Sequence, residues 1–337
     1  MIRELLYAES RVTDPYYNLA MEEFLLNRCG EGQSILYLWQ NRNTVVIGKN
    51  QNAWKECRIE AIQKAGGYIA RRLSGGGAVY HDTGNLNFTF ITGKQDYDVT
   101  RNLKVICRAV SRFGIEARIT GRNDLEAEGQ KFSGNAFHKG TENCCHHGTL
   151  MVQVDLSKLS EYLNVSGDKL RSKGVASVRS RVVNLGNLSP DMTIEGLKEA
   201  LREAFSCLGA SSEEALPLQT ISISEADEDV IHALAEKYAS REWVFGRKIS
   251  FESEIGTRFP WGEIQLLLQV NGGVICDAAM YSDALFGRLE EKIPPVLKGV
   301  SYEKEVMAEA LRRIHPEGEK ESIMLSDILQ YLNSIEL

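Results

Sequence analysis

The sequence lacks the features that mark a membrane or secreted protein. No apolar run approaches the ~20 residues that a bilayer-spanning helix needs. The N-terminal decapeptide MIRELLYAES carries Arg3 and Glu4 and has no apolar stretch of the kind found in a secretion signal. The seven cysteines are odd in number and scattered, apart from Cys144 and Cys145, so we expect no disulfide framework. These absences predict a cytoplasmic protein that has no membrane partner.

An excess of positive charge is also missing. The formal net charge is −7, which argues against a general nucleic-acid partner and leaves only local basic patches to consider. What the chain does contain is ordinary for a globular protein, with 43% hydrophobic and 25% charged residues. Its 337 residues favour one large domain and one smaller domain.

The periodicity of the apolar residues predicts helices and strands mixed along the chain. The first helix opens at Asp14–Pro15, where a capping carboxylate precedes a proline at the first helical position. Leu86, Phe88 and Phe90 alternate with polar residues, as in a strand that is buried on one face. The segment HKGTENCC, residues 138–145, is typical of a polar hairpin loop. Further helices are expected at 55–64, 100–113, 193–208, 225–238, 303–314 and 321–334, and further strands at 34–40, 44–48, 115–119, 131–137 and 148–154.

The pattern changes near residue 246. Two or three strands follow, two of them joined by the strong hairpin signal Asn271–Gly273, and two helices close the chain. We therefore predict a large domain over 1–246 and a small domain over 247–337. Because helices are interspersed with hairpins, the predicted class is α+β, with mixed β-sheets flanked by helices in the large domain and a small α/β domain at the C-terminus.

The stretch RRLSGGGAVYHDTGN, residues 71–85, combines positive charge with three successive glycines. Gly75, Gly76 and Gly77 have no Cβ atoms, so their amides can approach a bulky anion and form a concave nest. Arg71 and Arg72 add charge that suits phosphate or carboxylate. A tight turn between two strands is the other interpretation, and the glycines alone leave both open. The spacings of the common nucleotide motifs, G-x-x-x-x-G-K-[ST] and G-x-G-x-x-G, are absent.

Six more motifs accompany this stretch in a definite order. They are TVVIGKNQNAWKEC at 44–57, GRNDL at 121–125, KFSGNA at 131–136, HHGTLMV at 146–152, KGVASVRSRVVNL at 173–185 and EWVFG at 242–246. Together the motifs closely resemble those of the lipoate–protein ligases, a family that shares its catalytic fold with biotin–protein ligases and octanoyl transferases. The resemblance covers the large domain almost end to end, and EWVFG is similar to the family's junction with a small accessory domain.

The resemblance implies an ATP-dependent ligase. Such an enzyme activates lipoate with ATP, releases pyrophosphate and forms lipoyl-adenylate, and then passes the lipoyl group to one lysine of an acceptor. The implied acceptors are the apo lipoyl domains of 2-oxo acid dehydrogenase acyltransferase subunits and the glycine-cleavage H protein. Mg²⁺ is expected on the phosphates, and the family is usually monomeric.

The resemblance also assigns roles to individual residues. Lys131, in KFSGNA, becomes the decisive lysine that bridges carboxyl and phosphate oxygens without being a covalent nucleophile. Asp124 is a candidate ligand for adenylate or metal, or else the cap of a turn. His147 lies near the lipoyl carbonyl or has a structural role. The segment around Lys173 is expected to close over the adenylate and exclude water. The residues carried over to the nucleotide, the adenylate and the acyl group are Arg72, Gly75, Gly76, Gly77, Ala78, Val79, Tyr80, Asn85, Asp124, Lys131, His147 and Lys173.

Three other functions stay open at this point. A lipoyl or octanoyl transferase would take an already activated acyl donor and would need no ATP. A biotin–protein ligase would typically carry arginines inside its glycine loop, whereas this loop is uninterrupted. A binding module without chemistry would have no use for Lys131. Pyrophosphate release that depends on ATP and free lipoate separates the ligase from the transferase.

Two further sets of residues are ambiguous in the sequence. The apolar tail of lipoate needs a narrow tunnel, and core packing is the default interpretation for its candidates, which are Val45, Ile47, Gly48, Leu73 and Met151. Residues 144–147 carry metal-type atoms, but successive strand residues point to opposite faces. Four consecutive side chains therefore cannot all reach one tetrahedral ion, which disfavours a zinc site.

Overall fold

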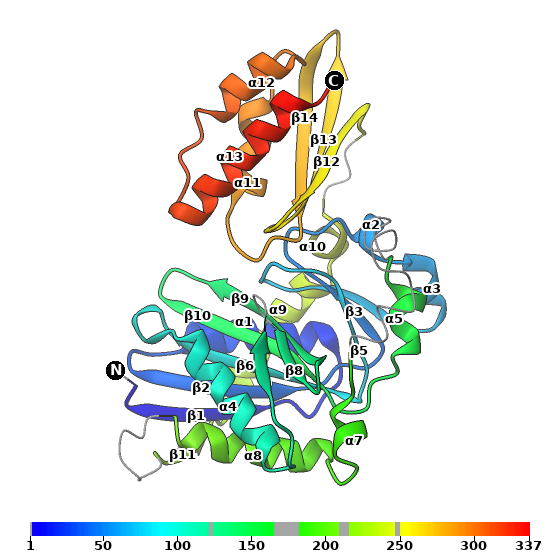
Figure 1. Cartoon of the computed structure of the whole chain (residues 1–337). Coiled ribbons are helices and arrows are strands. Elements are labelled where there is room, and N and C mark those ends of the chain that lie inside the picture. The colour runs from blue at the N-terminus through cyan, green and yellow to red at the C-terminus, as the bar shows by residue number, and fades with distance from the viewer. Residues whose placement is uncertain (1, 121–123, 165–181, 209–215, 247–249) are drawn as a thin grey trace. The chain divides into compact units, whose positions relative to one another are not determined.

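The computed structural model describes residues 2–120, 124–164, 182–208, 216–246 and 250–337. These residues form two compact units (Figure 1). Unit 1 comprises Met1–Val46, Glu56–Arg72 and Ala78–Val244, and unit 2 comprises Ile47–Lys55, Leu73–Gly77 and Phe245–Leu337. The boundary at 246 stays a prediction. Lys173 and the loop around it lie outside the described residues.

An eight-stranded mixed sheet is the centre of unit 1, with the strand order β11-β1-β2-β6-β10-β9-β8-β7. The strands are β1 (Glu4–Glu9), β2 (Gln33–Trp39), β6 (Asn85–Gly93), β7 (Arg118–Thr120), β8 (Asp124–Ala127), β9 (Gln130–Lys139), β10 (Asn143–Met151) and β11 (Leu218–Thr220). β1 runs parallel to β2 and β11, whereas the other neighbours are antiparallel. The predicted α+β class with mixed sheets is confirmed.

The predicted loop at 138–145 is wrong. β9 continues to Lys139 and β10 already begins at Asn143, so only 140–142 form the turn. The Cys-Cys-His-His run looks polar in the sequence, but its side chains are buried on both faces of a central strand.

Helices cover both faces of this sheet (Figure 1). α1 (Pro15–Arg28) starts as predicted, since the Asp14 carboxylate accepts hydrogen bonds from the amides of Tyr16 and Tyr17. α1 packs against α9 (Glu225–Ala239) on one side of the sheet. On the other side, α4 (Val99–Ser111) and α8 (Ile194–Ser206) enclose the main hydrophobic core, which contains Leu86, Phe88 and Phe90 of β6.

A second, three-stranded sheet in the order β4-β3-β5 accompanies the first. Its strands are β4 (Tyr68–Arg71), β3 (Thr44–Ile47) and β5 (Val79–His81). The short helices of the described residues are η1 (Lys94–Asp96), α2 (Ala53–Glu56), α3 (Ile59–Lys64), α5 (Ser157–Tyr162), α7 (Leu185–Leu188) and α10 (Arg241–Phe245). The helix predicted at 55–64 is interrupted. The Arg58 amide donates to the Tyr162 carbonyl, and Cys57 forms a β-bridge with Leu163, so the backbone at 57–58 is not helical.

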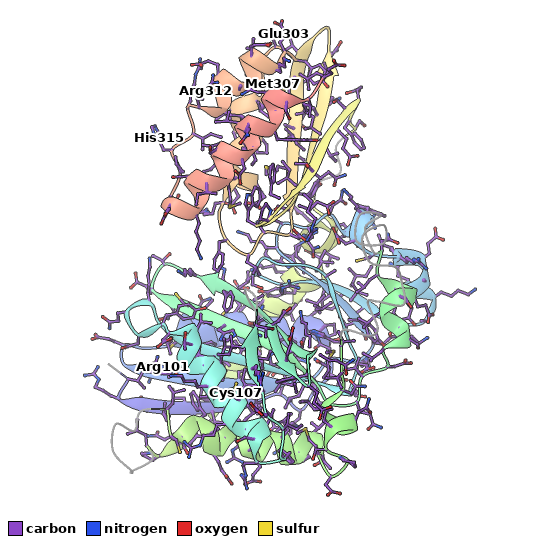
Figure 2. All side chains as sticks on the ribbon, viewed as in Figure 1. Arg101, Cys107, Glu303, Met307, Arg312 and His315 are labelled. Atoms are coloured by element: carbon purple, nitrogen blue, oxygen red, sulfur yellow. The ribbon has the colours of Figure 1, made fainter. Side chains whose placement is uncertain are left out.

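Unit 2 contains the antiparallel sheet β12 (Ser253–Phe259), β13 (Gly262–Asn271) and β14 (Val274–Ser282). The predicted hairpin is present, with Gly272 and Gly273 both at positive φ. Three helices pack on this sheet, namely α11 (Leu289–Leu297), α12 (Lys304–Leu311) and α13 (Glu319–Ser334). Figure 2 labels Met307 of α12, which is completely buried in this second core. α11 is missing from the prediction because Pro294 and Pro295 lie inside it.

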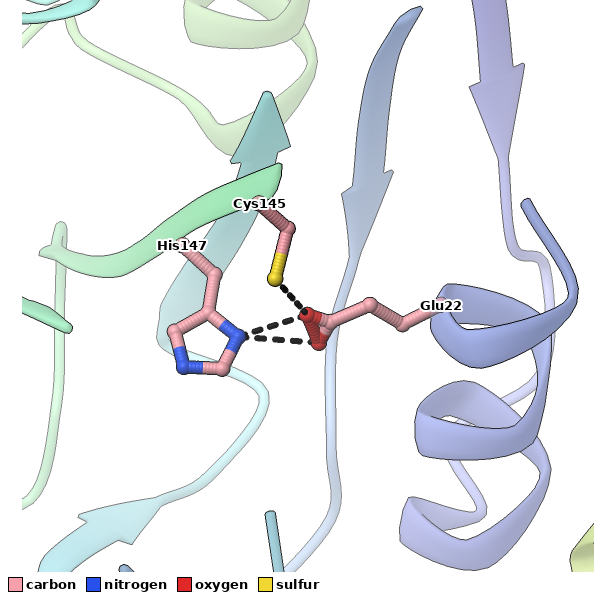
Figure 3. A group of neighbouring side chains, drawn as sticks. All are labelled: Glu22, Cys145 and His147. Atoms are coloured by element: carbon pink, nitrogen blue, oxygen red, sulfur yellow. Dashed lines mark hydrogen bonds and ion pairs between the residues drawn. The ribbon is translucent and has the colours of Figure 1, made fainter. Parts of the chain in front are cut away.

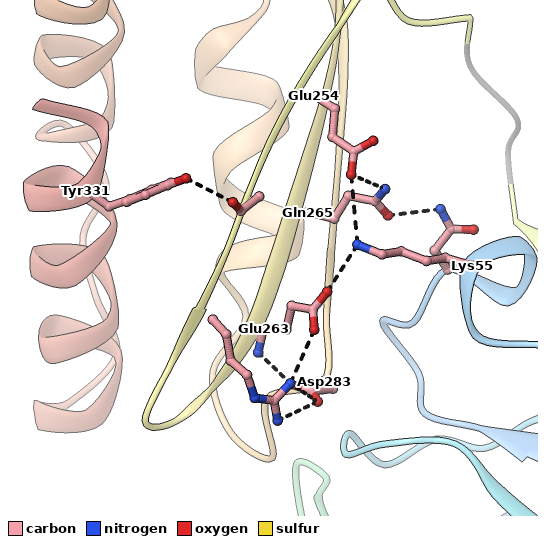
Figure 4. Close-up of polar contacts among 9 residues, drawn as sticks. Lys55, Glu254, Glu263, Gln265, Asp283 and Tyr331 are labelled. Atoms are coloured by element: carbon pink, nitrogen blue, oxygen red, sulfur yellow. Dashed lines mark hydrogen bonds and ion pairs between the residues drawn. The ribbon is translucent and has the colours of Figure 1, made fainter. Parts of the chain in front are cut away.

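Two short segments from the first third of the chain pack within unit 2. The Gly76 amide donates to the Ala284 carbonyl at 3.2 Å, and the Ser282 amide donates to the Asn50 carbonyl at 2.9 Å. Lys55 forms ion pairs with Glu263 at 3.1 Å and with Glu254 at 3.8 Å (Figure 4). Segments 47–55 and 73–77 are therefore held by strands and loops that come two hundred residues later in the sequence.

The helices of the described residues include none that has both the length and the apolar character to cross a membrane.

Candidate active site

One face of the large sheet carries a band of polar side chains across β9, β10 and β6. The strand register places Thr149 directly opposite Asn87, and His147 directly opposite Thr89 on one side and Ala136 on the other. Residues that are directly opposite share a face, and residues two apart on a strand do so too. This face lies on the α1 side, because the intervening apolar residues of β6 belong to the core under α4 and α8.

Lys131 lies at the start of β9 and reaches over this face. Its Nζ atom is 2.7 Å from the Asp124 carboxylate on β8, and about a third of each side chain is exposed. A Cβ atom added at Gly134 would lie 3.0 Å from Lys131 Nζ and 4.0 Å from Thr149 Oγ1. The ammonium therefore occupies the space that the absent side chain of Gly134 leaves. Predicted site residues Lys131 and Asp124 are brought together, as partners of one ion pair.

His147 is buried against a carboxylate that the sequence analysis missed. Its Nδ1 atom lies 2.6 Å and 2.9 Å from the two carboxylate oxygens of Glu22, and both side chains are less than one-tenth exposed (Figure 3). Glu22 is three residues from Leu19 and so falls in the buried stripe of α1. A glutamate in an otherwise apolar stripe could have identified Glu22 from the sequence, because a buried carboxylate requires a partner.

Cys145 completes this cluster, which could hold a metal ion on ligand type alone. Ligand atoms of Glu22, Cys145 and His147 all lie within 4.8 Å of one another. Burial raises the pKa of the Cys145 thiol well above its usual value, and the neighbouring Glu22 carboxylate raises it further. Since a metal needs the thiolate, and since His147 already pairs with Glu22, we assign no metal to this cluster. The four consecutive residues 144–147 do alternate between the two faces of β10.

Arg72 and Arg71 have different environments. Burial lowers the pKa of the Arg72 guanidinium to about 10, and the nearby Glu22 carboxylate opposes that shift. Arg72 donates to the Val46 carbonyl at 3.2 Å and keeps its charge close to the Glu22–His147 pair. Arg71 instead donates to the Trp243 and Val244 carbonyls at the end of α10, so it holds that helix in place.

Burial also lowers the pKa of His81 to about 3, and Arg72 adds to this effect.

The three glycines of the loop are not equivalent. A Cβ atom at Gly75 would lie 2.3 Å from the Ala284 carbonyl oxygen, and one at Gly48 would lie 2.2 Å from the Gly76 oxygen. Gly76 itself has a φ of 89°, whereas a Cβ atom added at Gly77 would point into open space. Close approach of backbone segments within unit 2 is thus one physical reason for this glycine-rich sequence.

The remaining predicted residues of this segment belong to unit 1. Val79 and Tyr80 lie on β5, opposite Val46 and Val45 of β3, and Ala78 precedes them. The Tyr80 hydroxyl donates to Asn43, and its ring packs against Tyr162. Among the tunnel candidates, Val45 and Ile47 are completely buried in β3, and Met151 ends β10. These positions agree equally with core packing and with a tunnel wall.

Asn85 and Asn87 are adjacent on the polar face of β6. Each side chain is 1% exposed, and Asn85 Nδ2 donates to Asn87 Oδ1 at 3.0 Å. Among the residues that the structure describes, Asn85 Oδ1 and Asn87 Nδ2 have no hydrogen-bond partner. Asn85 was a predicted site residue, but Asn87 was not, because in the sequence it is only a polar residue of an alternating strand.

Comparison with known protein families now adds to this geometry. Residues 14–206 match the family model described as the lipoyl protein ligase A/B catalytic domain. Residues 248–332 match the model of the bacterial lipoate protein ligase C-terminus. The chain belongs to the lipoate–protein ligase family. Lipoate-protein ligase A of Psychrobacter cryohalolentis is 39% identical to this ligase over 315 residues, which are 92% of this chain and 93% of the relative.

Solved structures agree with this assignment. P. falciparum LipL1 in complex with lipoate has a TM-score of 0.81 at 28% identity, covering 97% of this ligase and 99% of its own chain. A lipoate-protein ligase A bound with ATP has a TM-score of 0.62 at 28% identity, with 73% and 99% covered. A bipartite lipoate protein ligase from Thermoplasma acidophilum, described with its E2 lipoyl domain, has a TM-score of 0.64 at 29% identity, with 75% and 100% covered.

Proposed function

We propose that this ATP-dependent lipoate–protein ligase activates free lipoate at the polar face of β6, β9 and β10 and transfers the lipoyl group to the lysine of an apo lipoyl domain. The observation that carries the proposal is the position of Lys131, whose ammonium lies over Gly134 and beside Asp124 on that face. Gly134, which has no side chain, leaves room for a ligand next to the ammonium.

The proposed chemistry has two steps. A lipoate carboxylate oxygen attacks the α-phosphorus of ATP, the bond to the β-phosphate breaks, and pyrophosphate leaves. The ε-amine of the acceptor lysine then attacks the carbonyl carbon, an amide forms, AMP leaves, and the amine loses a proton. In the first step two anions must approach each other, so a fixed cation between them lowers the barrier. Lys131 supplies that cation without forming a covalent bond.

Asp124 is the proposed ligand for Mg²⁺. Its carboxylate is a hard oxygen donor and is partly exposed, which fits a metal that keeps most of its waters. Magnesium bound there would neutralise phosphate oxygens of the nucleotide. Asp124 would then bind the metal in place of the Lys131 ammonium. The ammonium would be free to face the substrate.

The Glu22–His147 pair and Arg72 provide a fixed, buried charge arrangement at the same face. We assign them to positioning the acyl substrate, with His147 nearest the lipoyl carbonyl. The proposed adenylate contacts of Gly75, Gly76, Gly77, Ala78, Val79, Tyr80 and Asn85 rest on the family resemblance, and so does that of Lys173.

The proposed acceptors are the lipoyl domains of 2-oxo acid dehydrogenase acyltransferase subunits and the glycine-cleavage H protein. The T. acidophilum ligase that was studied with its E2 lipoyl domain supports this choice. We further propose a monomeric enzyme of the cytoplasm, with which the seven unpaired thiols agree.

One assay tests the proposal. The protein is mixed with ATP, Mg²⁺, lipoate and an unmodified lipoyl domain, and pyrophosphate and the acceptor mass are measured together. We expect stoichiometric pyrophosphate release and an acceptor that carries one lipoyl group. Acyl transfer from an activated donor, with no ATP-dependent pyrophosphate from free lipoate, would instead indicate a transferase.

A further inference from the structure

Asn87 presents an unused hydrogen-bond donor in a buried position. Its side chain is 1% exposed, and because Asn87 Oδ1 accepts from Asn85 Nδ2, the Asn87 Nδ2 hydrogens are the free end of this amide in the structure. No described residue accepts from Asn87 Nδ2. Burying a donor without an acceptor is unfavourable, so such a group in a folded protein calls for a ligand or a water.

The position of Asn87 relative to Lys131 follows from the strand register. Asn87 on β6 lies opposite Thr149 on β10, and the Thr149 hydroxyl accepts from the Gly134 amide on β9. Lys131 Nζ lies above Gly134. Two strand spacings separate Asn87 from Gly134, which is about 10 Å. A carboxylate that accepts one hydrogen bond at each oxygen spans at most about 8 Å between its two donors, so donors on side chains that extend toward each other from these two positions can share one carboxylate.

The neighbours of Asn87 favour an acyl group over a nucleotide. Trp39 lies directly opposite Asn87 on β2 and stacks on Tyr37, with ring centroids 6.1 Å apart. Both aromatic side chains are almost completely buried. An aromatic, water-poor surface suits an alkyl chain, whereas a triphosphate needs charge and solvent.

We infer that Asn87 is a substrate-binding residue, whose Nδ2 donates a hydrogen bond to one carboxyl oxygen of the fatty or lipoic acid while Lys131 holds the other. The inference rests on the proposed site at this face. In this role Asn87 contributes specificity for acids that can place a carboxylate beside Lys131. The hydrogen bond from Asn85 orients the Asn87 amide.

Lipoate binding to the intact protein without ATP tests this assignment. Asn87→Ala is expected to raise the Kd for lipoate by about 10-fold to 100-fold, since hydrogen bonds to charged groups contribute about 1.5–3 kcal/mol. The KM for ATP at saturating lipoate stays within twofold. Asn87→Asp should bind lipoate still more weakly, because it replaces the donor with an anion. Asn87→Ser retains a hydroxyl donor and serves if the alanine variant unfolds.

Asn102→Ala is the matched control. Asn102 is also 1% exposed, and its Oδ1 has no partner among the described residues, but it lies on α4, in the layer that covers the other face of the sheet. It should leave the Kd for lipoate unchanged. An unchanged lipoate Kd in folded Asn87→Ala, or a rise in the KM for ATP alone, would overturn the assignment. Lipoate binding is measured without an acceptor. A protein that binds lipoate but does not transfer it would therefore refute the proposed function, whereas the effect of Asn87→Ala on the lipoate Kd could still be measured.

Discussion

At the scale of single residues, the site depends on charges whose partners are far away in the sequence. Glu22 and His147 are separated by 125 residues and still form a buried, hydrogen-bonded pair. Lys131 and Asp124 form a partly exposed pair within one hairpin. These two pairs should respond differently to mutation, because burial determines how much a lost partner costs.

Replacing Lys131 with alanine should abolish lipoylation and leave the fold intact. The ion pair with Asp124 is about one-third exposed, so its loss should change the free energy of unfolding by less than about 1 kcal/mol. The measurements are the acceptor mass after the complete reaction and a thermal unfolding curve. Lys139→Ala, at the exposed far end of β9, is the control and should retain activity. Undiminished product from Lys131→Ala would remove this lysine from the mechanism.

Replacing Glu22 with alanine should destabilise unit 1 strongly. The substitution leaves His147 and Arg72 buried without their carboxylate, and breaking a buried pair costs about 3–5 kcal/mol. Glu23→Ala is the matched control, because Glu23 pairs with Lys237 nearer the surface and its loss should cost about 1 kcal/mol or less. Denaturant unfolding of both variants compares the two losses. Equal losses would contradict the buried character of the Glu22 pair.

At the scale of elements, short sequence patterns correctly predicted the features that depend on neighbouring residues, such as the start of a helix or the buried face of a strand. The Asp14 cap placed the start of α1 correctly, and the alternation of Leu86, Phe88 and Phe90 identified β6 and its buried face. α11 was not predicted, because it contains Pro294 and Pro295 and a pair of prolines in a sequence indicates a helix break. Only the tertiary packing shows that the helix continues.

The site was only partly predictable for the same reason. Lys131, Asp124 and His147 stand in short recognisable motifs. Glu22 and Asn87 do not, because their roles come from strand register and from the packing of α1 on the sheet. A single sequence shows which side chains share a strand, but it does not show which helix residue faces them.

Within the loop elements, Gly75→Ala should be far more harmful to stability than Gly77→Ala. A methyl group at Gly75 would lie 2.3 Å from a backbone oxygen, which cannot move aside as a flexible side chain can, whereas a methyl group at Gly77 would meet no atom within 4 Å beyond its own chain neighbours. We expect a loss of several kcal/mol for the first and less than about 1 kcal/mol for the second. Chemical denaturation measures both. Similar losses would show that the close approach to Ala284 is not what requires glycine.

At the scale of the whole molecule, stability should depend on pH through Glu290. Burial raises the pKa of its carboxyl group to about 7, and Glu290 Oε2 has no partner among the described residues. A carboxyl whose folded pKa is raised binds its proton more tightly in the folded state. Its contribution is therefore complete below the unfolded pKa of about 4.5 and is lost as the pH rises through 7.

Glu290→Gln should remove this dependence. We expect the variant and the wild type to have similar melting temperatures at pH 5, and the variant to be the more stable at pH 8, by on the order of 3 kcal/mol. Thermal unfolding in matched buffers gives the comparison. Glu305→Gln on α12, an exposed glutamate, should not alter the pH profile. A wild-type profile that is flat between pH 5 and 8 would refute the assignment.

The hydrogen bond from the Gly76 amide to the Ala284 carbonyl has a consequence for how this polypeptide can be divided. A gene cut between the two regions matched by the family models would yield an N-terminal fragment whose glycine loop has lost its backbone support. Such a fragment would recover that loop only by reassociating with the C-terminal piece, so the two halves should complement each other in trans rather than work as independent modules.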